Sequence, residues 1–250
     1  MVPDRSPERI VSSGRPVNAD AVATPAPRRL NLAAIEASLH EVQAHFGAIN
    51  ADLSERRDAM DNRVIGNMIA GYRLVDEYVA SGKDLFDIER VGGLLEINNM
   101  VLCGTDPVRR GEFASHLAAT EQRFYDEDEG GIGDLMEWYD MHRTESVWKR
   151  AAGTFVRILS KPQLFIEGNH RSGALIMSYI LMRDGYPPFV LTADSAVAFF
   201  NPSTVIRNTR KKSIAMLYRL PGIKKRYARF LEAQADPRFL LNGAKRSLRA

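Results

Sequence analysis

The sequence lacks most of the features that would take it outside the ordinary globular proteins. Only one of its 250 residues, Cys103, is a cysteine, which excludes a disulfide within the chain and a cysteine-rich zinc site. No run of about 18 apolar residues occurs, so there is no candidate transmembrane helix. The first 28 residues have no apolar segment of the kind found in secretory signals. We therefore expect a soluble, cytoplasmic protein, although a translocated effector is also compatible with these features.

Several common catalytic motifs are missing as well. There is no Gly-x-Ser-x-Gly segment and no Walker-type glycine loop. None of the five histidines is spaced from another histidine and a carboxylate in the way that zinc ligands are. These absences exclude the commonest serine hydrolases, P-loop enzymes and zinc enzymes.

The formal net charge of +3 conceals an uneven distribution. From residue 203 to 250 there are 13 Lys and Arg against two acidic residues, whereas the preceding 202 residues sum to −8. Such an asymmetry fits either solvated helix faces or a surface for nucleic acid or an acidic partner. Because no nucleic-acid motif and no aromatic platform accompanies the basic residues, we favour the first interpretation.

The hydrophobic pattern predicts an all-α fold. Apolar residues recur at helical spacing through most of the chain, and Asn31 and the pair Asp106-Pro107 are typical of helix starts. The expected helices cover 31–46, 53–80, 94–104, 107–124, 147–159, 174–185 and much of the basic C-terminal part. Residues 126–133 are an acidic, glycine-rich loop, and 189–192 is the only candidate strand.

One segment, residues 163–174, carries the pattern of a binding site. It joins two apolar helices, and the first-turn amides of the second helix lack intrahelical partners and carry a partial positive charge. Gly168 permits a tight turn over which those amides can bind phosphate oxygens, with Arg171 as a bidentate clamp. Asn169 could orient a phosphate oxygen, and Glu167 is placed to share a divalent cation with the phosphates. The alternative is an ordinary Glu-Gly-Asn turn, with Arg171 paired to an acid.

This segment resembles the signature of the Fic/Doc family, His-x-Phe-x-[Asp/Glu]-Gly-Asn-Gly-Arg-x-x-Arg. The matching residues are Phe165, Glu167, Gly168, Asn169 and Arg171. The resemblance implies an all-helical core that binds a nucleoside triphosphate, usually ATP with Mg²⁺. It also implies transfer of AMP, or of the γ-phosphoryl group as in Doc, to a hydroxyl of a target protein.

By the same resemblance each residue of the segment has an expected role. Gly168, Asn169, His170 and Arg171 would bind phosphate, Glu167 the metal, and Phe165 would anchor the loop.

The chain would then comprise a disordered tail (1–28), a helical lead-in (29–58), a Fic-like core (59–200) and a basic helical extension (201–250). A short flap that docks the target in extended form is expected within 104–125.

Three positions depart from the family pattern. Gln163 stands where the family has the histidine that deprotonates the target hydroxyl, and a neutral amide has no useful basicity. His170 replaces a Gly or, in Doc, a Lys, and Ala174 replaces the second Arg; these two changes favour the Doc-like pattern. His170 is a candidate surrogate base, because the helix dipole disfavours its protonation, but a phosphate-contacting or structural role is the alternative.

The lead-in also invites comparison with the family's inhibitory helix, whose glutamate pairs with the second Arg. Residues 46–51 occupy the corresponding place, and there Asn50 would replace the glutamate as Ala174 replaces its arginine. Losing both halves of a buried ion pair costs less than losing one. The resulting expectation is a Fic/Doc-like nucleotide-binding protein with weak or atypical AMP or phosphoryl transfer. The alternative is a non-catalytic module that binds a protein partner through the flap groove.

Overall fold

The computed structural model describes residues 28–127, 130–211 and 214–241, and within these ranges the chain is all-α, as predicted. It contains eleven α-helices and a short 3₁₀ helix, η1. They are α1 (Leu32–Ala44), α2 (Phe46–Ala51), α3 (Asn62–Ala80), α4 (Gly92–Cys103), α5 (Pro107–Glu112), α6 (Ala114–Phe124), α7 (Ile132–Met141), α8 (Val147–Leu159), α9 (Asn169–Arg183), α10 (Ala196–Arg207), α11 (Ile214–Ala233) and η1 (Pro237–Phe239). The expected disordered tail lies outside the described residues, except for residue 28.

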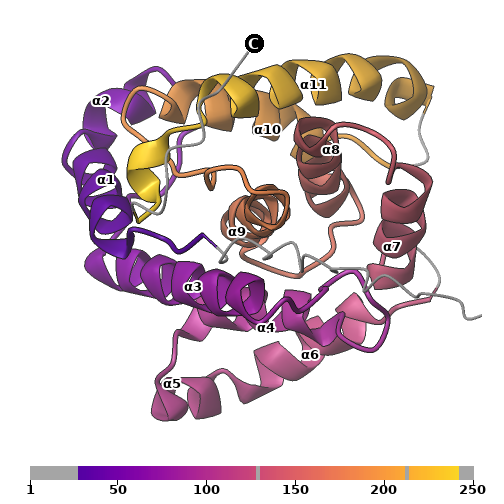
Figure 1. The fold of residues 1–250 in the computed structure, drawn as a ribbon, viewed down its shortest axis with the longest axis horizontal. Coiled ribbons are helices and arrows are strands. Elements are labelled where there is room, and N and C mark those ends of the chain that lie inside the picture. The colour runs from indigo at the N-terminus through magenta and orange to yellow at the C-terminus, as the bar shows by residue number, and fades with distance from the viewer. Residues whose placement is uncertain (1–27, 128–129, 212–213, 242–250) are drawn as a thin grey trace, which may run out of the picture.

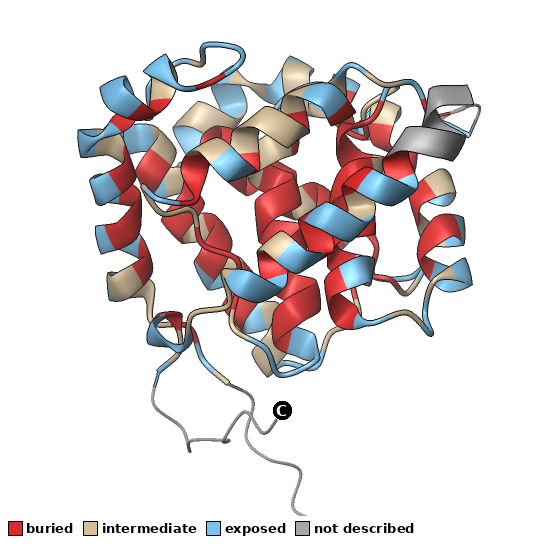
Figure 2. Cartoon of the chain, turned by 90° about the horizontal axis from the view of Figure 1, so that it is seen from above, coloured by how far each residue is buried: buried red, intermediate tan, exposed pale blue. Residues whose placement is uncertain are grey.

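Helix α9 lies at the centre of the molecule, with the other long helices around it (Figure 1). From Ser172 to Met182 every one of its residues is buried, which is typical of a helix that is covered on all sides. Its most extensive partner is α8, followed by α3 and α4. Figure 2 shows that the buried residues are concentrated in the interior of the helical assembly, while the outer faces of the helices are exposed. None of the helices in the described ranges is long and apolar enough to cross a membrane; the expected cytoplasmic location stays a prediction.

Side-chain caps set several helix boundaries. Asn31 accepts from the amide of Ala34 at 3.2 Å and so begins α1, and Asp106 accepts from Val108 at 2.9 Å ahead of α5, both as the sequence indicated. The predicted start of the second long helix near residue 53 is wrong. Asp61 caps that helix by accepting from the amide of Val64 at 2.7 Å.

The segment 189–192, predicted as a strand, is irregular. Its carbonyl groups are satisfied by side chains of the surrounding helices rather than by a neighbouring strand. Tyr72 and Ser178 both donate to the carbonyl of Phe189, at 2.7 and 2.9 Å, and Ser38 donates to that of Leu191 at 2.9 Å. With these hydrogen bonds made, Phe189 and Val190 are buried without a sheet.

Two further segments bear on the expected organisation. The region 104–125 folds into α5 and α6, so the helix expected over 107–124 is present with a break at Phe113, and the flap expected there stays a prediction. The basic C-terminal part is helical, and Tyr227 and Leu231 of α11 are 2% exposed and belong to the main core. The expected boundary at residue 200 falls inside α10.

The contact between α7 and α8 depends on Gly153, and this generates a stability prediction. A Cβ atom at Gly153 would overlap the rigid indole ring of Trp138, whereas one at Gly66 on α3 would meet nothing within 4 Å. We expect Gly153→Ala to lower the free energy of unfolding by about 1–3 kcal/mol through overpacking. Gly66→Ala should raise it by about 0.5–1 kcal/mol through helix propensity. Chemical denaturation measures both, and equal stability of the two variants would contradict this packing.

Candidate functional site

The loop that joins α8 to α9 is held at its start by Gln163. The side-chain amide of Gln163 donates to the carbonyl of Leu159 at 3.2 Å, in the last turn of α8. The backbone carbonyl of Gln163 accepts from Nε of Arg123 at 3.1 Å. The residue at the family's base position therefore closes a helix end in this structure.

The turn into α9 is built on Gly168, whose φ of +77° lies in the left-handed region that glycine adopts without strain. A Cβ there would lie 2.9 Å from Nδ2 of Asn98. That amide nitrogen donates to the carbonyl of Glu167 and to the hydroxyl of Ser172, both at 2.9 Å. Asn98, on α4, thus holds both sides of the turn.

Asn169 holds the loop from within. Its amide nitrogen donates to the carbonyl of Phe165 at 2.7 Å, and its amide oxygen accepts from the Phe165 backbone nitrogen at 3.0 Å. Phe165 is 1% exposed and stacks on Phe124 with ring centroids 5.8 Å apart, so it anchors the loop in the core. Because the side chain of Asn169 is engaged in this way, its contribution to an anion site in this geometry would come from the backbone amide.

The N-terminus of α9 has the amides that an anion site requires. Ser172 is the first residue of the helix whose amide bonds back, to the carbonyl of Gly168 at 2.9 Å. The amides of residues 169–171 precede it and have no acceptor within the helix. The helix dipole adds a partial positive charge at the same place.

Two guanidinium groups lie beside this helix end. Arg171 donates to the carbonyl of Val101 at 3.3 Å and lies 3.7 Å from the carboxylate of Glu167. Arg57, from the loop between α2 and α3, lies over the ring of Phe200 and its Nη2 is 3.4 Å from His170. Burial lowers the pKa of both arginines, but a guanidinium remains charged at any physiological pH.

Arg57 is a residue that the sequence did not single out. Asn50 positions it: its amide oxygen accepts from the Arg57 backbone nitrogen at 2.9 Å, and its amide nitrogen donates to the Arg57 carbonyl at 3.1 Å. Nε of Arg57 is buried and has no hydrogen-bond partner among the described residues. Asn50 thus connects the lead-in to the α9 end through Arg57.

His170 points toward α10. Its Nε2 lies 3.0 Å from the hydroxyl of Ser203, which itself donates to the carbonyl of Phe200 at 2.7 Å. Burial, and then the positive charge of Arg57, lower the pKa of His170 to about 3. The ring is therefore neutral at physiological pH, but its Nε2 is bonded to Ser203, which favours a structural role over that of a base.

Glu167 is the only acidic residue of the loop, and its side chain is 59% exposed. Within the described residues, no three His, Cys, Asp or Glu side chains form a group that could hold a metal ion. A divalent cation at Glu167 would thus need ligands from a bound molecule as well as from the protein. Phosphates and waters usually complete the shell of Mg²⁺ in this way.

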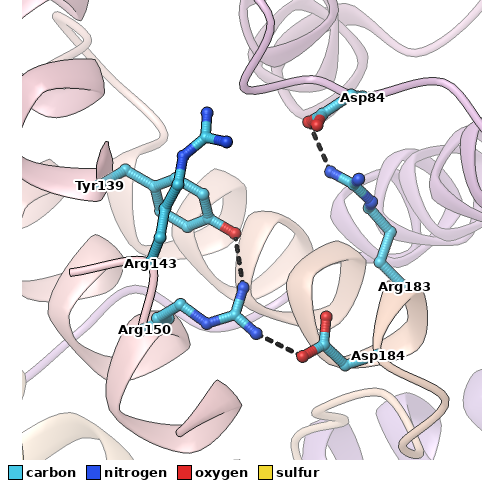
Figure 3. A pocket seen from close by; sticks show the side chains of 6 residues that line it. All are labelled: Asp84, Tyr139, Arg143, Arg150, Arg183 and Asp184. Atoms are coloured by element: carbon cyan, nitrogen blue, oxygen red, sulfur yellow. Dashed lines mark hydrogen bonds and ion pairs between the residues drawn. The ribbon is translucent and has the colours of Figure 1, made fainter. Parts of the chain in front are cut away.

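A separate pocket of about 210 Å³ lies where the other end of α9 meets α7 and α8 (Figure 3). Arg150 donates to the Tyr139 hydroxyl at 3.0 Å and pairs with Asp184. Arg183 pairs with Asp84. Since these charges are matched within the fold, we assign this pocket a structural role in linking the helices.

Comparison with known proteins finds distant relatives of this chain. The chain is 24% identical over 148 residues to the protein adenylyltransferase fic-1 of Caenorhabditis elegans, a match that covers 56% of this chain and 28% of that protein. It is 27% identical over 160 residues to the protein adenylyltransferase Fic of Drosophila melanogaster, covering 59% of this chain and 31% of that protein. The chain is a relative of the Fic protein adenylyltransferases.

The relationship to Fic proteins has a limited extent. The chain spans less than a third of the length of these curated relatives. No protein-family model matches it, and no solved structure matches it. The relationship supports the resemblance that the segment 163–174 indicated, while the roles of its individual residues stay predictions.

The paired hydrogen bonds of Asn169 generate a stability prediction. Asn169→Ala would leave the buried backbone nitrogen and carbonyl of Phe165 without partners, so we expect the free energy of unfolding to fall by at least about 1–3 kcal/mol. Asn62→Ala, at an exposed position of α3, is the matched control and should change it by less than about 0.5 kcal/mol. Urea denaturation of both variants is the measurement. A loss in the control as large as that in Asn169→Ala would contradict this role.

The low pKa of His170 generates a prediction for pH dependence. The folded pKa of about 3 lies below the ordinary histidine pKa of 6.5, so between these values the unfolded state binds more protons. The free energy of unfolding should therefore fall as the pH drops from 6.5 toward 3, with His170 contributing up to about 1.4 kcal/mol per pH unit.

The test compares denaturation at pH 7 and pH 5. His170→Gln should show a shallower loss of stability than the wild type, because one proton-binding difference has been removed. His40→Gln, at an exposed position of α1, controls for a general effect of removing a histidine. An unchanged slope in His170→Gln would show that the ring is not held neutral.

Proposed function

We propose that the chain binds the phosphates of a nucleoside triphosphate at the N-terminus of α9, with ATP as the expected nucleotide. The observation that carries this proposal is the conformation of the loop. Gly168 turns in the left-handed region, and the amides of residues 169–171 follow it without intrahelical acceptors. Helix N-termini with such amides are established anion sites.

The two neighbouring guanidinium groups suit the same ligand. Arg171 would contact phosphate directly, since its partners at 3.3 and 3.7 Å are a carbonyl and a largely exposed carboxylate. Arg57 would add a second positive charge at the same helix end, where its Nη2 lies 3.4 Å from His170. The planar guanidinium of Arg171 matches the bidentate geometry of phosphate.

The residues present also fit Mg²⁺. One carboxylate together with phosphate oxygens and waters is a usual way in which proteins bind this ion, and Glu167 is exposed beside the α9 end. Bound there, the ion would neutralise phosphate charge during transfer. In our proposal Glu167 holds the metal, while Gly168, Asn169, His170 and Arg171 surround the phosphates mainly through their backbone amides and the Arg171 side chain.

We further propose that transfer of AMP or phosphoryl to a protein hydroxyl is weak. Gln163 has no basicity, and its side chain is engaged with the end of α8. The most basic nearby alternative, His170, is buried and bonded to Ser203. Without a general base the rate would fall by about 10²–10⁴-fold.

The second candidate function is a non-catalytic module that binds a target protein without modifying it. The engagement of Gln163 in helix closure favours it, because this side chain is bonded to the carbonyl of Leu159 and has no basicity for a transfer reaction. In that case the surface of α5 and α6, which replaces the expected extended flap, would contact the partner. Nucleotide binding at α9 separates the two functions experimentally.

Isothermal titration with ATP and Mg²⁺ tests the binding site. We expect Arg171→Ala to raise the Kd by about 10- to 100-fold, because one charge-assisted contact of about 1.5–3 kcal/mol is lost. Arg73→Ala, at an exposed position of α3, removes the same charge elsewhere and should leave the Kd within twofold. Absence of ATP binding by the wild-type protein would reject the nucleotide proposal in favour of the second function.

A second arm tests catalysis. Gln163→His should increase the label transferred from ATP to protein by about 10²–10⁴-fold if the missing base limits the rate. ATP labelled at the α-phosphate reports AMP transfer, and ATP labelled at the γ-phosphate reports phosphoryl transfer. If the variant binds ATP yet transfers neither label to proteins of a cell lysate, the non-catalytic function is the better one.

A further inference from the structure

A second cavity, of about 550 Å³, lies against α7, α8 and α11. On α8 it is lined by Gly153, Val156 and Arg157 among others, whereas Phe155 and Leu159 of the same helix contact Gly173 of α9. The cavity is thus on a different face of α8 from the one that supports α9. Its volume is in the range of small-molecule sites.

One wall of the cavity is apolar and rigid. The indole of Trp138 is 7% exposed and is stacked on the ring of His142 with centroids 4.2 Å apart. Gly153 allows the indole to lie directly on α8. Val156 and Leu220, each 5% exposed, complete a surface that fits a planar or aliphatic body.

The rest of the lining is cationic. It includes five Lys and Arg side chains and a single acidic one, Glu145. The five basic residues are Lys149, Arg157, Lys211, Lys224 and Lys225. Like charges gathered around one hollow repel each other and create a positive potential inside it.

Ion pairs within the fold compensate only part of this charge. Lys224 pairs with Glu145 at 2.6 Å. Arg157 and Lys211 share one carboxylate, that of Asp134, each at 3.5 Å. The remaining two, Lys149 and Lys225, are exposed and form no ion pair within the described ranges.

Lys211, which lines the cavity, is buried rather than solvated. Its side chain is 2% exposed, and its ammonium group donates to the carbonyl of Gly130 at 3.1 Å. Burial lowers its pKa to about 8, and the positive charges of Arg157 and Arg123 act in the same direction. A bound anion would relieve this repulsion, since an opposite charge stabilises the protonated amine.

We propose that the cavity between α7, α8 and α11 binds a small amphipathic anion. Its apolar body would lie against Trp138, Val156 and Leu220, and its phosphate, sulfonate or carboxylate group would face Lys149, Lys225 and Arg157. This site is separate from the loop at the α9 N-terminus, and the proposal does not depend on nucleotide binding there.

The test uses anilinonaphthalene sulfonate, which combines an aromatic body with one anionic group. The chain has two tryptophans, so Trp148→Phe leaves Trp138 as the only donor for energy transfer to the bound probe. In this background, Lys149→Glu with Lys225→Glu should raise the Kd by about tenfold or more. Binding should also weaken as the ionic strength rises.

A matched variant separates the site from bulk charge. Arg73→Glu with Arg90→Glu makes the same change in net charge at two exposed positions outside the cavity, and it should leave the Kd within about twofold. Equal loss in the two double variants, or no loss in either, would overturn the proposal. Thermal unfolding checks folding, and the Lys149/Lys225 variant should be at least as stable as its parent because a repulsion has been removed.

The Arg171→Ala variant distinguishes this site from the proposed nucleotide site. It should bind the probe as tightly as the wild type, whatever its affinity for ATP. Loss of probe binding in Arg171→Ala would place the probe at the α9 loop and overturn the proposal, while leaving the proposed function intact.

Discussion

The left-handed turn at Gly168 is the constraint from which the rest of the candidate site follows. With φ at +77° the chain leaves the loop and enters α9 within one residue, and a side chain at that position would collide with Asn98. Asn98 holds the turn from α4, while Asn169 ties the start of α9 to Phe165. Because Phe165 is in turn buried against Phe124, the amides at the helix end are held by the hydrophobic core itself. A rigid support of this kind is what keeps an anion site preorganised.

The same architecture separates the backbone of the candidate site from its side chains. The backbone part of the site, which depends on Gly168 and on the packing of α8 and α9, is intact in this relative of the Fic adenylyltransferases. The side-chain chemistry is changed: Gln163 closes a helix end, and His170 is neutral and bonded to Ser203. Arg57, held by Asn50, brings a charge from the lead-in to the helix end. In the proposed function, phosphate binding and group transfer would be separable, because they would depend on different atoms of the same loop.

The amino-acid pattern alone predicted a good part of the fold. The helices over 147–159 and around 174–181 were predictable because apolar residues repeat at helical spacing on faces that must be buried, and Asn31 and Asp106 cap as short-range chemistry dictates. The errors have physical causes as well. The segment 189–192 resembles a strand in composition, yet Tyr72, Ser178 and Ser38, distant in sequence, satisfy its carbonyls. The start of α3 does not follow from hydrophobic spacing, because Asp61 caps it within a polar stretch that contains several other possible caps.

For the site, the turn at Gly168 follows from the local sequence, since a glycine turn ahead of a helix is a property of adjacent residues. Tertiary structure decided which groups surround it. In the sequence, Asn98 is one of several polar residues of α4, and Arg57 is one of many arginines. Packing of the helices brings both of them to the start of α9. The distribution of charge also depends on tertiary structure. Composition shows a basic C-terminal end, but the packing of α11 against α8 brings Lys224 and Lys225 together with Lys149 around one cavity. Local rules specify turns and helices, whereas contacts between distant segments depend on how the helices bury their apolar faces together.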